Sequence, residues 1–78
     1  MTNERITAEE IKEAEALVRK QLREAYSRIK NGEDAGKVMG TSFILMKNIE
    51  YLAEKCGYSN EKLSAMYAEE MANVGLSA

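Results

Sequence analysis

The sequence predicts an all-α fold, and three observations lead to that prediction. The 78-residue chain has no Pro, and it is rich in residues of high helix propensity such as Ala, Glu, Lys, Leu and Met. Its apolar residues recur at steps of three and four, and Gly residues follow the periodic runs as they do at helix ends. We therefore expect one helical domain over residues 1–78, with helices of about 7–31, 35–56 and 60–74 and frayed ends at 1–5 and 76–78.

The first helix has a recognisable start and stop. Thr7 is the expected N-cap and Glu10 its capping-box partner, while Asn31 and Gly32 supply the left-handed stop. A helix of about 24 residues is roughly 36 Å long, whereas a compact chain of this size has a radius of gyration of about 11–12 Å. The first helix should therefore overhang a simple bundle, which favours a homodimer. Its apolar side chains form one narrow stripe: Ile11, Ala14, Val18, Leu22, Ala25 and Ile29.

The second helix follows a short connection, which favours a long antiparallel hairpin with the first helix. Asp34 is its expected N-cap. Gly36 and Gly40 weaken the opening turns by roughly 1 kcal/mol each relative to Ala, so we expect a frayed start near Thr41 or a close helix crossing. The side that should face the first helix consists of Val38, Leu45, Ile49, Leu52 and Cys56.

The third helix follows Gly57, with Ser59 or Asn60 as its N-cap, and it ends at Gly75. We expect this shorter helix to fold back across the second one. Its residues at helical spacing are Leu63, Met66, Tyr67, Met71 and Val74.

The second helix is apolar on two sides, because Ile44 and Tyr51 point nearly opposite to its core-facing stripe. Either the third helix covers these two side chains or another molecule does. Aromatic and Met side chains are enriched at protein interfaces, so we favour another molecule. The residues expected at a partner or dimer interface are Met39, Phe43, Ile44, Tyr51, Leu17 and Tyr26.

Four basic residues of the first helix fall within about 40° of one another on its surface. They are Lys12, Arg19, Arg23 and Lys30, and Tyr26 lies beside them. This stripe is a candidate site for an anionic partner, such as an acidic protein patch. The alternative is a solvated flank whose charge is balanced by Glu15 and Glu24.

The residue content argues against most enzyme chemistry. The chain has no His, which is the commonest general base and metal ligand, and it has a single Cys. We therefore expect no enzymatic activity, no catalytic residues, no metal site and no cofactor. A small-ligand carrier remains an alternative, and it would need an apolar cavity near Met39, Phe43 and Met46.

Segment 49–74 has a local pattern typical of a helix-turn-helix. The run LAEKCGYSNEKLSAMYAEE places Ala53, Gly57 and Leu63 where such motifs need a close crossing, a turn and an apolar lock. It resembles the second helix-turn-helix of arabinose-operon-type transcription activators, and this resemblance implies a DNA-binding regulator. The second helix of the motif is mostly acidic, however, and acidic side chains repel phosphates. Nucleic-acid binding by this segment is therefore the alternative prediction.

The remaining features indicate a cytoplasmic protein without a membrane segment. Cys56 has no second Cys to pair with, and no run approaches the ~20 apolar residues of a membrane span. The formal charge of −2 gives no global attraction to nucleic acid. The predicted function is binding without chemistry, by a homodimeric helical adaptor, inhibitor or regulator that docks on a larger protein. Such small helical proteins are common among bacterial and phage regulatory factors.

Overall fold

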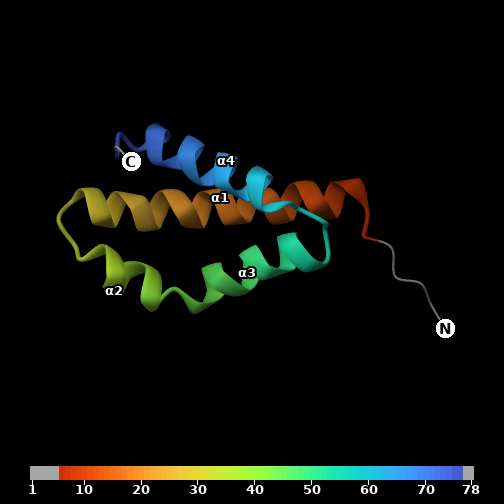
Figure 1. Ribbon diagram of the computed structural model, residues 1–78, viewed down its shortest axis with the longest axis horizontal. Coiled ribbons are helices and arrows are strands. Elements are labelled where there is room, and N and C mark those ends of the chain that lie inside the picture. The colour runs from red at the N-terminus through yellow and green to blue at the C-terminus, as the bar shows by residue number, and fades with distance from the viewer. Residues whose placement is uncertain (1–5, 77–78) are drawn as a thin grey trace.

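The computed structural model describes residues 6–76, and within that range the chain folds into α-helices joined by short connections (Figure 1). The all-α prediction is confirmed for this part of the chain. The helices are α1 (Ala8–Lys30), α2 (Ala35–Gly40), α3 (Phe43–Glu54) and α4 (Asn60–Asn73). The predicted fraying of residues 1–5, 77 and 78 lies outside the described residues. Leu76 is not frayed, because its backbone N–H donates to the Met71 carbonyl at 2.8 Å and its side chain packs against the core.

The helix ends follow the local signals in the sequence. Thr7 and Glu10 form the predicted capping box, in which the Glu10 N–H donates to Thr7 Oγ1 at 3.1 Å and the Thr7 N–H donates to Glu10 Oε1 at 2.8 Å. Ser59, one of the two predicted caps of the last helix, accepts from the Lys62 N–H. Gly32 after α1 has the positive φ that favours a residue without a side chain.

The predicted continuous helix over 35–56 is wrong, because the structure divides it at Thr41 and Ser42 into α2 and α3. Both residues turn their hydroxyl groups back onto the preceding turn: Thr41 Oγ1 donates to the Lys37 carbonyl at 2.7 Å, and Ser42 Oγ donates to the Val38 carbonyl at 2.6 Å. Hydroxyl groups that bond the backbone in this way compete with helix continuation. With Gly40 weakening the same turn, they account for the break.

The last helix packs on α1 and not across the second helical segment, which corrects the predicted arrangement. In Figure 1, α1 lies in the middle with α4 on one side and α2 and α3 on the other. The α2–α3 segment runs antiparallel to α1, and α4 runs in the same direction as α1. The first turns of α1 extend past the ends of α3 and α4, as the length of this helix predicted. Two of the principal extents of the molecule are only 22 and 18 Å.

The core lies along the apolar stripe of α1. Val18 and Leu22 are fully buried there, and Leu45 and Leu52 reach them from α3 while Leu63 lies on α4. Each of the other helices therefore buries its apolar side mainly against the same helix. The remaining buried apolar residues are Ala25, Tyr26, Val38, Tyr58 and Met66.

Replacing Leu22 by Ala should lower the free energy of unfolding by about 2–5 kcal/mol, because the change removes a fully buried side chain and leaves a cavity. Leu17→Ala is the matched control on the same helix, and it should cost well under that amount because Leu17 is about half exposed. Urea denaturation of both variants measures the difference. Equal losses for the two substitutions would contradict this location of the core.

Candidate protein-binding surface

Five large apolar side chains are exposed among the described residues, and they are Phe43, Ile44, Met46 and Tyr51 of α3 and Leu17 of α1. Ile44 is 70% exposed, Phe43 73%, Leu17 46% and Tyr51 37%. We call these residues the α3 surface, which consists of Phe43, Ile44 and Tyr51 of α3 together with Leu17 of α1. All four belong to the six residues that the sequence predicted for a partner interface.

The helical register of α3 explains why these residues face outward. Leu45 and Leu52 are buried one helical heptad apart, and Ile44 and Tyr51 each precede one of them by one residue. One residue rotates a helix by about 100°, so Ile44 and Tyr51 occupy the flank beside the buried side. On this flank Asn48 Nδ2 donates to Gln21 Oε1 of α1 at 3.0 Å. Leu17 lies one turn before Gln21 and therefore at the same edge of the α1–α3 contact.

The other two predicted interface residues belong to the chain's own core. Tyr26 is buried, and its burial raises the pKa of its hydroxyl group. Met39 is partly buried and packs against the same core cluster. The sequence periodicity placed Tyr26 and Met39 at the edges of the apolar stripes. Because α4 and α2 pack against α1, these two side chains lie in or against the core.

The predicted basic stripe lies on the side of α1 that faces α4. Arg19 Nη1 donates to Glu70 Oε2 at 2.7 Å, and Arg23 Nη1 donates to Glu70 Oε1 at 2.9 Å. Lys30 Nζ donates to the Val74 carbonyl at the end of α4. Three of the four predicted anion-binding residues therefore hold α4, while Lys12 is exposed on α1. In this structure Arg19 and Arg23 pair with a carboxylate of the chain itself, and Lys30 bonds a backbone carbonyl.

Glu70 is the buried charge at the centre of this contact, with only 1% of the residue exposed. Burial by itself raises the pKa of its carboxyl group, but hydrogen bonds from Arg19, Asn73 and Arg23 outweigh burial and lower that pKa below its usual range. The residue is therefore ionised at neutral pH, with its charge balanced inside the fold. Sequence reasoning missed this role, because it counted Glu70 only among the acidic residues of the helix-turn-helix-like segment. The available signal was its position one turn after Met66 on the apolar side of the helix.

A second network ties the start of α4 to α1. The Tyr58 hydroxyl donates to Glu15, and Arg19 Nε donates to the other Glu15 oxygen at 2.8 Å. Burial and the Glu15 hydrogen bond together raise the pKa of Tyr58 to about 12. Lys62 Nζ lies 4.2 Å from the centre of the Tyr58 ring, within cation–π range. Arg19 thus connects both networks along the α1–α4 contact.

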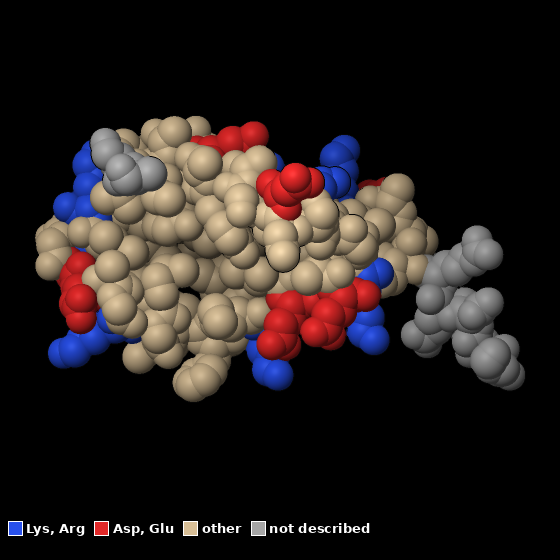
Figure 2. Space-filling view, in the orientation of Figure 1, with Lys and Arg blue, Asp and Glu red and all other residues tan. Residues whose placement is uncertain are grey.

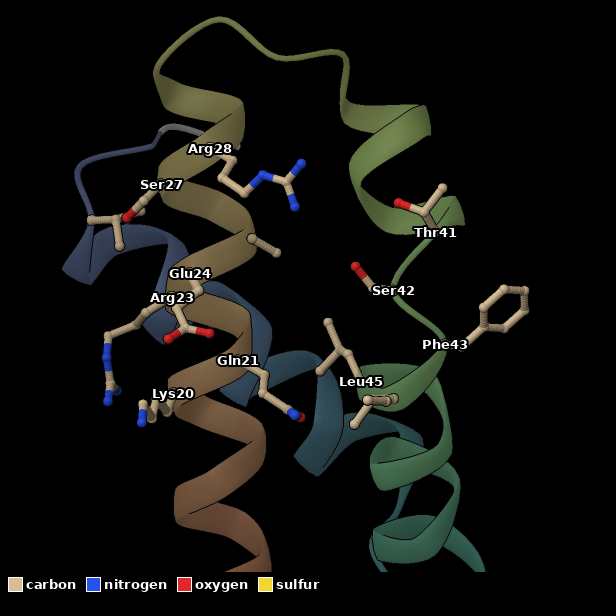
Figure 3. Close-up of a pocket in the computed structure, with 13 residues that line it drawn as sticks. Lys20, Gln21, Arg23, Glu24, Ser27, Arg28, Thr41, Ser42, Phe43 and Leu45 are labelled. Carbon is tan, nitrogen blue, oxygen red and sulfur yellow. The ribbon is translucent and has the colours of Figure 1, made fainter.

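A groove of about 950 Å³ lies between α1 and the break that separates α2 from α3 (Figure 3). Gln21 and Leu45 point toward each other across it, Arg28 and Ser42 line its upper part, and Phe43 points away from α1. Its lining includes Phe43 and Ile44 but neither Met39 nor Met46, and most of its exposed surface is apolar, although charged side chains such as Arg28 also line it. The carrier alternative predicted an apolar cavity near Met39, Phe43 and Met46, and Phe43 is the one of these three residues that lines this groove.

The helix-turn-helix-like segment contains the predicted turn, since Gly57 has a φ of 76° and Leu63 is buried. Its second helix nevertheless packs mainly on α1. Glu61 and Glu69 are among its exposed residues, and Glu69 pairs with Arg19 at 2.8 Å. On the face shown in Figure 2, basic and acidic groups alternate near the margins of a broad uncharged area. No observation of the described residues favours a nucleic-acid site here.

No protein-family model, curated protein or solved structure matches this chain. Among residues 6–76, none of the helices combines the length and the apolar character needed to cross a membrane.

Glu70→Ala should lower the free energy of unfolding by about 2–4 kcal/mol, because two partly buried Arg side chains lose their carboxylate and a cavity forms. Glu69→Ala is the matched control, since its side chain is 59% exposed and its ion pair with Arg19 should contribute at most about 1 kcal/mol. Chemical denaturation at pH 7 compares them. A Glu70→Ala variant as stable as Glu69→Ala would show that the buried network does not hold α4.

The contribution of Glu70 should also depend on pH in a defined direction. Its pKa is lowered by folding, so its stabilisation is fully present above the ordinary value of 4.5 and is lost as the pH falls through the lower value of the folded state. Glu70→Gln carries no titratable group at this position. The difference in unfolding free energy between the natural chain and Glu70→Gln should therefore shrink between pH 6 and about pH 2. A constant difference over that range would refute the assignment.

Proposed function

We propose that the chain is a non-enzymatic helical protein-binding module that acts as a homodimer and docks on a larger protein. The observation that carries this proposal is the exposure of Ile44 and Tyr51, together with Phe43 and Leu17. The sequence left two ways to cover Ile44 and Tyr51, and α4 packs on α1 without covering them. A second molecule is the remaining way to remove these side chains from water.

The size of the α3 surface supports this proposal. Its four side chains expose on the order of 400 Å² of apolar surface, which is within the ~300–600 Å² of the largest patch on a typical monomer, a patch that is often functional. The α1–α4 side is unsuited to the same role because its charges are neutralised within the chain. We therefore assign the binding function to the α3 surface, as a small adaptor, inhibitor or regulator in the reducing cytoplasm, where an unpaired Cys56 persists.

At micromolar concentration the chain should sediment as a dimer of twice 8.7 kDa. Ile44→Asp should convert it to a monomer with unchanged helix content, because a charged side chain at a buried contact without a partner is strongly unfavourable. The expected weakening of self-association is at least about 30-fold, the equivalent of ~2 kcal/mol. Sedimentation velocity and circular dichroism measure the two effects.

Ala65→Asp is the matched control, because this residue is exposed on the outward side of α4. It should leave the dimer unchanged. If Ile44→Asp unfolds the chain, Ile44 stabilises the fold and not an interface. If the natural chain sediments as a monomer at every accessible concentration, the homodimer part of the proposal is wrong.

A further inference from the structure

We infer that the groove between α1 and the break between α2 and α3 binds a free medium-chain carboxylic acid in its anionic form. Its carboxylate lies at Arg28, and its alkyl chain lies on the apolar part of the lining. This site goes beyond the protein-binding function proposed above and requires no second copy of the chain. The groove has a volume of about 950 Å³, within the range of about 300–1,000 Å³ that is usual for small-molecule pockets.

The apolar part of the lining suits an alkyl chain. Ala25 of α1 contributes to it, together with Ile44 and Leu45 of α3, and most of the exposed surface of the groove is apolar. Along α1 the groove extends from Gln21 to Arg28, which are seven residues or ~10 Å apart (Figure 3). A partner helix of average length, about 11–12 residues, would extend past its ends. The groove therefore matches a medium-chain alkyl group better than a protein helix.

The charged part of the lining favours an anion. Three basic side chains and one acidic side chain line the groove, which gives a formal charge of +2, and they are Lys20, Arg23, Arg28 and Glu24. Arg23 is already paired with Glu70 of α4. Lys20 takes part in none of the ion pairs found within residues 6–76. Lys20 and Arg28 are therefore the cations that an anionic ligand meets.

Arg28 is the better placed of these two cations. Figure 3 shows its side chain in the upper part of the groove, extending from α1 toward the segment that carries Thr41 and Ser42. Its Nε and Nη2 donate to Glu33 at 3.1 and 2.8 Å, whereas Nη1 donates to no group within residues 6–76. Both side chains of this ion pair are about half exposed, so the pair is weak. A ligand carboxylate can bind Nη1 and compete with Glu33 for the guanidinium group.

The neighbouring hydroxyl groups favour a carboxylate over a phosphate. Thr41 Oγ1 donates to the Lys37 carbonyl and Ser42 Oγ donates to the Val38 carbonyl, so neither hydroxyl group has a proton left for an anion. A phosphate group has three strong acceptor oxygens to satisfy, whereas a carboxylate has two. The smaller number suits a groove in which one guanidinium group is the main donor.

The test titrates the full chain with decanoate below its micelle concentration, followed by calorimetry and by two-dimensional amide NMR. We expect one bound molecule per chain, with a dissociation constant on the order of 100 μM. The amide shifts should be largest in residues 21–28 and 41–45. Hexanoate should bind at least about tenfold more weakly, because four CH₂ groups leave the apolar lining. Decyltrimethylammonium, with the same chain and a positive head, should bind at least about fivefold more weakly than decanoate.

Two variants that break the same ion pair should change the affinity for decanoate in opposite directions. Arg28→Gln removes the partner of the carboxylate and should weaken binding about fivefold to tenfold. Glu33→Gln frees the guanidinium group and should tighten binding about twofold to fivefold. Lys12→Gln is the matched control, because it removes an exposed positive charge of α1 outside the groove. Its affinity should stay within about twofold of that of the natural chain.

The outcomes are distinct from those of the dimer test. Equal binding of decyltrimethylammonium overturns the preference for an anion, and amide shifts outside the groove overturn its location. A change in the same direction for Arg28→Gln and Glu33→Gln overturns the role of Arg28. Binding to phosphatidylglycerol vesicles without binding of monomeric decanoate overturns the free acid as the ligand and indicates a membrane surface. A chain that sediments as a monomer and still binds decanoate overturns the homodimer and supports this site.

Discussion

The position of α4 depends on one buried carboxylate. Glu70 lies within the contact between two helices, where an unpaired charge would be strongly unfavourable, and Arg19 and Arg23 of α1 supply the compensating charge. Only one of the two long sides of α1 offers these guanidinium groups. The apolar residues of α4 could pack against several neighbours, but its carboxylate can be buried only on this side. The ion network therefore contributes specificity to an arrangement whose stability comes mainly from the apolar core.

The location of α4 determines what remains uncovered elsewhere. A third helix lying across α3 would have covered Ile44 and Tyr51, whereas a helix on the far side of α1 leaves them in water. The salt bridges of Glu70 and the exposed apolar side chains of α3 lie on opposite sides of α1. Three of the basic residues that suggested an anionic partner, Arg19, Arg23 and Lys30, hold α4 on its side of α1. Because these side chains have partners within the chain, we place the candidate interface on the exposed apolar residues of α3.

The sequence predicted local structure well because local structure depends on neighbouring residues. The capping box of Thr7 and Glu10, and the helix that it begins, follow from interactions within one turn. The helix break at Ser42 was harder to predict from the sequence. It depends on hydroxyl groups that donate to backbone carbonyls and not to water. The packing partner of α4 was not predictable from its apolar spacing, because spacing identifies a buried side without identifying what buries it. Tyr26 was misplaced for the same reason.

The candidate surface was predicted in part, and the two errors have a common origin. Met39 and Tyr26 lie at the margins of apolar stripes, where a small rotation of a neighbouring helix decides between burial and exposure. Ile44 lies on the flank beside the buried side of α3 and Phe43 lies nearly opposite Leu45, and both side chains are highly exposed. In this chain they are also the residues whose burial most requires a second molecule, which is why we assign the binding function to α3 and not to the charged side of α1.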